Sequence, residues 1–144
     1  MLNKRKRSQF RNAGLLILRV GLGIMFILHG YPKMFGGPEM WTEVGGAMQH
    51  LGIDFAPMFF GFMAGVTEFF GGIFLILGLF FSPSVIFLFL VMVVATAKHL
   101  AVGDGFANYS HSIEMGVVFI SLLLIGPGTY SLDRKLQNKR RRRY

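Results

Sequence analysis

The chain has 144 residues, a formal net charge of +8 and no cysteine; 53% of its residues are hydrophobic and only 15% are charged. A soluble domain carries about 25% charged residues, so the composition excludes an ordinary soluble fold, and the lack of cysteine excludes disulfides, thiolate catalysis and cysteine metal sites. The basic residues gather at the two ends of the chain, beside apolar segments, so we predict no nucleic-acid partner.

Four apolar runs follow one another along the chain. A helix needs about 20 apolar residues to cross about 30 Å of hydrocarbon. The runs cover residues 13–31, 57–81, 83–102 and 111–125, with Ser82-Pro83-Ser84 expected as the turn between the second and third. The fourth run is long enough only if it begins near Asn108. The sequence therefore predicts an all-α, four-helix transmembrane bundle over residues 13–128, between a basic N-terminal segment (1–12) and a basic C-terminal tail (129–144).

The basic residues also predict the orientation of the bundle. Lys and Arg are enriched in cytoplasmic segments, and both ends of this chain are rich in them. Two cytoplasmic termini require an even number of crossings, which agrees with four. We therefore expect an inner-membrane protein whose basic ends contact anionic lipid, with outer loops at about residues 34–56 and 103–109.

The first outer loop contains an apolar stripe with helical spacing. Its members are Met40, Val44, Ala47, Met48 and Leu51. The spacing predicts a short amphipathic helix, with Trp41 at the membrane interface. Two interpretations stay open: the helix lies on the membrane surface, or it caps the mouth of the bundle.

Ionisable residues inside the predicted helices are the candidates for function. Such groups are expensive in lipid and usually face the bundle interior beside a partner. At 1.5 Å per residue, Arg19 is expected near the inner end and Glu68 near the middle. The remaining groups are expected together near the outer end: His29, Lys33, Lys98, His99 and Glu114.

Three interpretations of these residues remain open. In the first, they form a structural network in which Glu68 and Glu114 neutralise Arg19, Lys33 or Lys98, with Arg19 and Glu68 as the predicted charge-pairing residues. In the second, the outer group and Glu68 form a cofactor pocket for a quinone head group: His29 or His99 would bind a quinone oxygen, and Glu114 and Glu68 would carry protons. In the third and least favoured, His29 and His99 hold a haem iron axially. We predict no other metal site.

The order and spacing of these segments resemble the DoxX family of small four-helix membrane proteins. The resemblance covers residues 14 to 133. It rests on the segments Arg19 to Lys33, Ala64 to Gly72, Leu77-Gly78-Leu79, Ala95 to His99, Gly105-Phe106, Glu114, and Gly126 to Asp133. It implies a four-helix bundle whose recurring polar positions are occupied here by Arg19, His29, Lys33, Glu68, His99 and Glu114.

The resemblance also implies a role in redox chemistry. The family takes its name from a subunit associated with a thiosulfate:quinone oxidoreductase, and other members are linked to oxidative-stress and thiol-redox complexes. We therefore expect a quinone-interacting subunit whose other redox centre comes from a bound cofactor or from a soluble or membrane partner. The alternatives are a non-enzymatic anchoring subunit and a small-molecule transporter. A transporter of this size would have to act as a homo-oligomer, because four helices make a thin wall for a pore.

Overall fold

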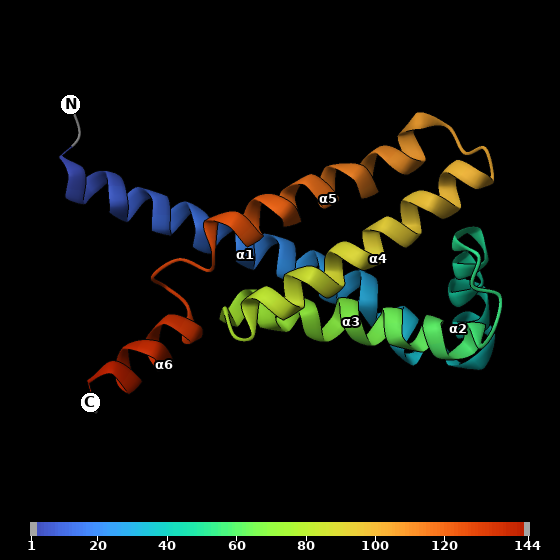
Figure 1. Cartoon of the computed structure of the whole chain (residues 1–144), viewed down its shortest axis with the longest axis horizontal. Helices are drawn as coiled ribbons and strands as arrows, with labels where there is room; N and C mark the ends of the chain where they lie inside the picture. The colour runs from blue at the N-terminus through green and yellow to red at the C-terminus, as the bar shows by residue number, and fades with distance from the viewer. Residues whose placement is uncertain (1–2, 143–144) are drawn as a thin grey trace.

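The computed structural model describes residues 3–142, which form helices joined by short connections (Figure 1). Its helices, in chain order, are α1 (Lys4–Phe35), α2 (Gly37–Gly45), the 3-10 helix η1 (Gly46–Leu51), α3 (Pro57–Leu77), α4 (Phe81–Ala101), α5 (Phe106–Ile125) and α6 (Leu132–Arg141). Four of them, α1, α3, α4 and α5, are long and apolar enough to cross a membrane. The predicted four-helix transmembrane fold is confirmed.

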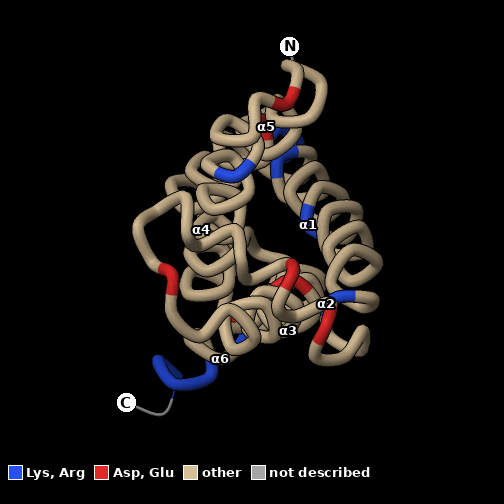
Figure 2. The backbone as a smooth tube through the Cα atoms, turned by 90° about the vertical axis from the view of Figure 1, so that its right-hand side faces the viewer, with Lys and Arg blue, Asp and Glu red and all other residues tan. Residues whose placement is uncertain are grey.

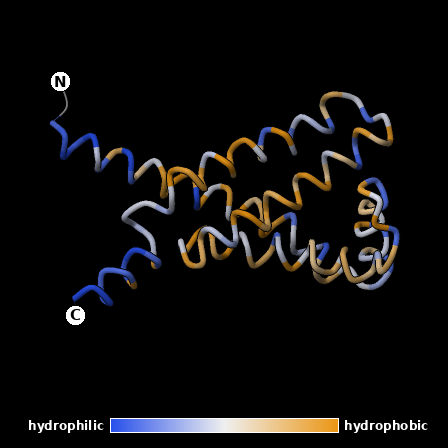
Figure 3. The backbone as a smooth tube through the Cα atoms, in the orientation of Figure 1, coloured by the Kyte–Doolittle hydropathy of each residue, from blue (hydrophilic) through white to orange (hydrophobic). Residues whose placement is uncertain are grey.

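Both described termini lie at one end of the bundle, the left in Figure 1. We call this the terminal end; it contains residues 3–12, 78–80 and 126–142. The opposite end, called the cap end, contains α2, η1 and the α4–α5 connection. Figure 2 looks at the cap end and shows acidic residues on α2 and on neighbouring loops, whereas the hydrophilic ends of the chain project from the terminal end in Figure 3.

Helix α1 is longer than the span that the sequence predicts. Its 32 residues extend about 48 Å at 1.5 Å per residue, against about 30 Å of hydrocarbon. The basic N-terminal segment is therefore part of the same helix, and residues 4–11 are exposed beyond the bundle. Met1, Leu2, Arg143 and Tyr144, which belong to the predicted basic ends, lie outside the described residues. The fourth span also begins earlier than its apolar run: α5 starts at Phe106 and has 20 residues, which is long enough to cross the membrane.

Helices α1 and α3 pack with their backbones in direct contact. A Cβ atom added to Gly23 would lie 2.5 Å from the carbonyl oxygen of Gly72, and one added to Gly30 would lie 2.4 Å from the amide nitrogen of Phe69. Small residues permit this approach between membrane helices. Helix α5 meets α1 instead through large side chains, since the Phe26 and Phe119 rings lie 5.2 Å apart.

The turn between α3 and α4 lies earlier than predicted. Helix α3 ends at Leu77, and Gly78 follows in the left-handed region with φ 61°, a conformation that commonly ends helices. Ser82 and Pro83 lie inside the first turn of α4, where proline is tolerated because its missing N–H has no helical partner there. The prediction of a turn at residues 82–84 was therefore wrong by about one helical turn.

The amphipathic segment of the first loop packs on the bundle. Ala47 is buried, Met40, Val44 and Met48 are half-buried, and Leu51 alone of the stripe is exposed. The indole Nε1 of Trp41 donates a hydrogen bond to the Lys33 carbonyl at 2.8 Å. Of the two interpretations, the structure favours a cap over α3 and α4 at the cap end of the bundle.

Candidate functional site

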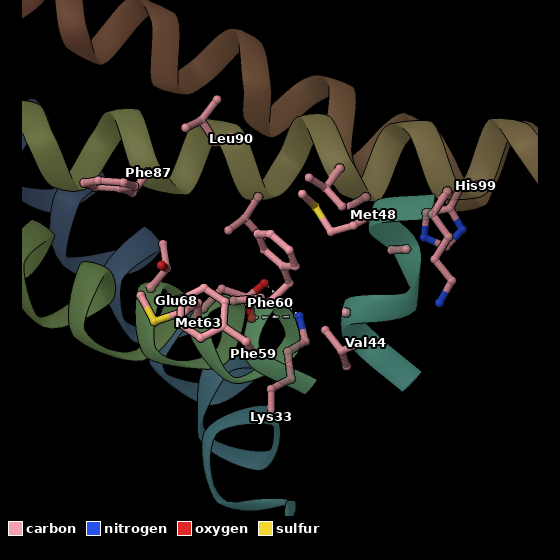
Figure 4. A pocket seen from close by; sticks show the side chains of 18 residues that line it. Lys33, Val44, Met48, Phe59, Phe60, Met63, Glu68, Phe87, Leu90 and His99 are labelled. Atoms are coloured by element: carbon pink, nitrogen blue, oxygen red, sulfur yellow. Dashed lines mark hydrogen bonds and ion pairs between the residues drawn. The ribbon is translucent and has the colours of Figure 1, made fainter. Parts of the chain in front are cut away.

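A pocket of about 470 Å³ lies between α3 and α4, beneath the cap of α2 and η1 (Figure 4). Most of its wall is apolar. The aromatic and aliphatic side chains of the wall include Phe59, Phe60, Met63, Phe87, Leu90 and Val94. Its polar wall residues are Lys33, Thr67, Glu68, Lys98 and His99. This combination of an apolar cavity and a few polar groups is typical of small-molecule sites.

The pocket opens sideways toward the lipid. Phe59 and Phe87 are each 58% exposed and Leu90 is 49% exposed, although all three line the pocket. They lie within α3 and α4, the helices that cross the membrane. An apolar molecule dissolved in the bilayer would therefore reach the pocket between these two helices without passing through water.

An ion pair between α1 and α3 forms the floor of the pocket. The Lys33 Nζ lies 2.7 Å from both carboxylate oxygens of Glu68, and Glu68 is only 2% exposed. Glycines bring the two backbones close enough for this contact, since a Cβ atom on Gly65 would lie 2.6 Å from the Met34 amide nitrogen. The pair neutralises two charges that would otherwise be costly at membrane depth.

His99 and Lys98 line the pocket from the last turn of α4. The Nδ1 atom of His99 lies 2.5 Å from Oδ2 of Asp104, in the connection to α5. Asp104 was predicted only as part of the outer loop at residues 103–109, with no role at the site. The sequence feature that could have predicted its position is the preceding Gly103. Glycine commonly ends a helix, and the residue after it then folds back over the last turn of α4.

The predicted outer group is divided between two faces of the bundle. Lys33, Lys98 and His99 lie at the pocket together with Glu68. His29 and Glu114 are exposed and do not line it; the ring of His29 lies 6.5 Å from that of His111 on α5. The physical reason is helical geometry: neighbouring Gly30 faces α3, so His29 points about 100° away, toward α5. Within residues 3–142, no group of three or more His, Asp or Glu side chains is arranged to hold a metal ion.

Arg19 binds backbone carbonyls and no carboxylate. It is 1% exposed, and its guanidinium donates to the carbonyl oxygens of Leu75 (2.9 Å), Ile76 (2.9 Å), Pro127 (2.6 Å) and Tyr130 (3.1 Å). The first two belong to the last turn of α3, where free carbonyls and the helix dipole favour a cation. The predicted charge pairing of Arg19 with Glu68 is corrected: Glu68 pairs with Lys33, about two turns of α3 away.

Asp133 completes this arrangement at the terminal end, although no structural role was predicted for it. Its two carboxylate oxygens accept hydrogen bonds from the amides of Phe80 (3.1 Å) and Phe81 (2.9 Å) at the start of α4. Its own amide donates to the Gly78 carbonyl at 3.0 Å. The segment after α5 therefore closes the α3–α4 turn, with Arg19 on one side and Asp133 on the other.

Comparison with known proteins agrees with this architecture. Residues 14–102 match the family model DoxX. Inner membrane protein YphA of Escherichia coli (strain K12) is 32% identical over 131 residues, which cover 84% of this chain and 89% of the relative. An uncharacterized protein of Haemophilus influenzae is also 32% identical, over 138 residues that cover 92% of this chain and 97% of the relative. No solved structure shows a significant match. The chain is a multi-pass membrane protein that belongs to the DoxX family.

Proposed function

We propose that this protein is a quinone-interacting subunit of a membrane redox or oxidative-stress system, and that the quinone head group binds in the pocket between α3 and α4. The observation that carries the proposal is the combination of a lipid-facing opening with polar residues at the inner wall. Quinones have the matching chemistry: a flat apolar ring, two polar oxygens and a long apolar tail that stays in the membrane.

Each part of the pocket has a counterpart in such a ligand. The cavity of about 470 Å³ falls within the range of roughly 300–1,000 Å³ that small-molecule sites occupy. Phe59, Phe60 and Phe87 would contact the ring, and the ammonium group of Lys98 would donate to a ring oxygen. A bound quinone would supply reversible two-electron, two-proton chemistry. The tail would leave between the exposed rim residues of α3 and α4.

Filling the pocket should abolish binding. Ala95 lies on the α4 wall, and Ala95→Phe would place a ring in the space of the head group. We expect labelling by a photoreactive benzoquinone, measured by peptide mass spectrometry in lipid nanodiscs, to fall at least tenfold. The matched control is Leu124→Phe, at a lipid-facing residue that is 84% exposed. Labelling that stays at the wild-type level in Ala95→Phe, with an unchanged melting temperature, would refute the site.

One observation favours the alternative of a non-enzymatic anchoring subunit. Within the described residues, no buried side-chain nitrogen or oxygen atom lacks a hydrogen-bond partner, so the fully buried polar groups already satisfy one another without a ligand. In that case the wild-type protein would show no saturable labelling by the quinone probe. The labelling experiment therefore separates the two functions.

We also propose that the terminal end lies in the cytoplasm and contacts anionic lipid of the inner membrane. The exposed residues 4–11 and helix α6 carry their basic side chains at this end, and the Escherichia coli relative is named an inner membrane protein. Leu132 and Leu136 lie four residues apart on α6 and are exposed, as expected for a helix that rests on a membrane surface. An alkaline phosphatase fused after α6, active only outside the cytoplasm, should be inactive; an active fusion would reverse the orientation.

A further inference from the structure

The end of α4 holds Asp104 directly against His99. Gly103 adopts φ +74° and its amide donates to the Leu100 carbonyl at 3.3 Å, while the amide of Asp104 donates to the His99 carbonyl at 3.0 Å. These two bonds make a Schellman motif, in which glycine takes the left-handed position that other residues disfavour. The motif returns the chain over the last turn of the helix and places the carboxylate of Asp104 beside the ring of His99.

This contact determines which nitrogen of His99 is available to a ligand. A carboxylate only accepts hydrogen bonds, so Nδ1, at 2.5 Å from the Asp104 oxygen, carries a proton. In the neutral imidazole the other nitrogen, Nε2, is then an acceptor. Within residues 3–142 it has no hydrogen-bond partner, and the residue lines the pocket.

We propose that Asp104 fixes His99 as the hydrogen-bond acceptor of the pocket, so that the pocket binds the hydroquinone form of its ligand in preference to the quinone. This inference rests on the proposed quinone site. A hydroquinone hydroxyl donates to Nε2, while its oxygen accepts from the ammonium of Lys98, which also lines the pocket. A quinone has only acceptor oxygens, so it can use Lys98 but leaves Nε2 without a partner.

The other charged groups of the pocket do not replace this acceptor. Glu68 is the only carboxylate among the described lining residues, and both of its oxygens are held by Lys33 at 2.7 Å. His99 and Thr67 are the uncharged side-chain acceptors that the described wall offers to a ligand hydroxyl, and of these two only His99 has its acceptor nitrogen fixed by a neighbouring carboxylate. Asp104 acts through His99 and is a positioning residue.

The test compares three probes on the full chain in nanodiscs under anaerobic conditions: a decyl-substituted benzoquinone, its hydroquinone, and the hydroquinone dimethyl ether, which lacks both hydroxyls. Each competes with the photoreactive label. We expect the hydroquinone to bind about tenfold more tightly than the other two, the effect of one hydrogen bond. Asp104→Leu, which removes the acceptor oxygens but keeps about the same side-chain size, should bring the three affinities to about the same value. Asp54→Leu, at an exposed loop carboxylate outside the pocket, should keep the tenfold preference.

A second readout is independent of any ligand. In protein labelled with ¹⁵N-histidine, the His99 signals, assigned by their loss in His99→Gln, should show a protonated Nδ1, and Asp104→Leu, which has no acceptor, should shift them toward the Nε2-protonated form. Equal binding of quinone and hydroquinone to the wild type, or a protonated Nε2 in the neutral wild-type ring, would overturn the role of Asp104 and leave the quinone site standing. No binding of either probe to the wild type would overturn the quinone site itself, and the inference with it.

Discussion

Replacing Arg19 with methionine is expected to destabilise the terminal end of the bundle severely. The substitution removes four hydrogen bonds to the carbonyls of Leu75, Ile76, Pro127 and Tyr130. The Leu75 carbonyl keeps its hydrogen bond from the Gly78 amide, so the carbonyls of Ile76, Pro127 and Tyr130 lose their partner. At about 1–3 kcal/mol for each, the total loss is roughly 3 kcal/mol or more. That is a large part of the 5–15 kcal/mol by which a typical protein is stable. The measurement is the unfolding temperature in mild detergent.

Two further variants make this result specific. Arg11→Met removes an exposed arginine from the same helix and should leave the unfolding temperature unchanged. Arg19→Lys keeps the charge but not the planar fork of donors, so it cannot reach the carbonyls of α3 and those of the 127–130 segment together, and it should fall between Arg19→Met and the wild type. If Arg19→Met unfolds at the same temperature as the wild type, these hydrogen bonds contribute nothing to the stability of the folded protein.

The second large effect is expected at the ion pair of Lys33 and Glu68. Lys33→Met leaves the carboxylate of Glu68, which is 2% exposed, without its cation, and breaking a buried pair in this way costs about 3–5 kcal/mol. Glu68→Gln should cost less, because the lysine side chain is 31% exposed and its ammonium can move toward the polar surface. Unfolding of both variants in the same detergent measures the difference.

The double variant Lys33→Met with Glu68→Gln tests the pairing directly. It leaves no unpaired charge, so it should recover much of the stability that Lys33→Met loses, with a coupling free energy of about 1–3 kcal/mol. Lys98→Met is the matched control, since Lys98 lines the same pocket but forms no ion pair within the described residues. Strictly additive effects of the two substitutions would mean that the pair contributes no coupling.

The quinone proposal makes the ion pair relevant to binding as well as to stability. Glu68 and Lys33 form the floor of the pocket, so a double variant that folds still presents a changed polar wall to a ligand. Comparison of its labelling with that of Ala95→Phe would separate the loss of polar contacts from the loss of space. The anchoring alternative requires no such difference, because in that case the pair only joins α1 to α3.

Much of the architecture was determined by the sequence alone, because the membrane imposes a strong and local constraint. A hydrocarbon layer requires long apolar helices, so the four spans could be predicted from composition and length. The one difference in α1 is that the helix begins earlier than the predicted span. The ends of the helices were harder to predict from sequence. The turn expected at Ser82-Pro83-Ser84 was misplaced because Gly78 already ends α3. The apolar stripe of the first loop predicted a helix, but it could not show whether that helix lies on the membrane surface or caps the mouth of the bundle.

Which ionisable side chains meet was decided only by the tertiary structure. Depth along a helix follows from residue counting, but the direction of a side chain around the helix depends on which face packs against a neighbour. Gly30 and Gly65 bring α1 and α3 together, and this contact pairs Lys33 with Glu68 while it turns His29 toward α5. Arg19 and Asp133 meet partners more than 50 residues away in sequence, and no local pattern contains such partners. The sequence therefore determined that charged groups lie inside the membrane, and the packing of the four helices determined which of them form the pocket.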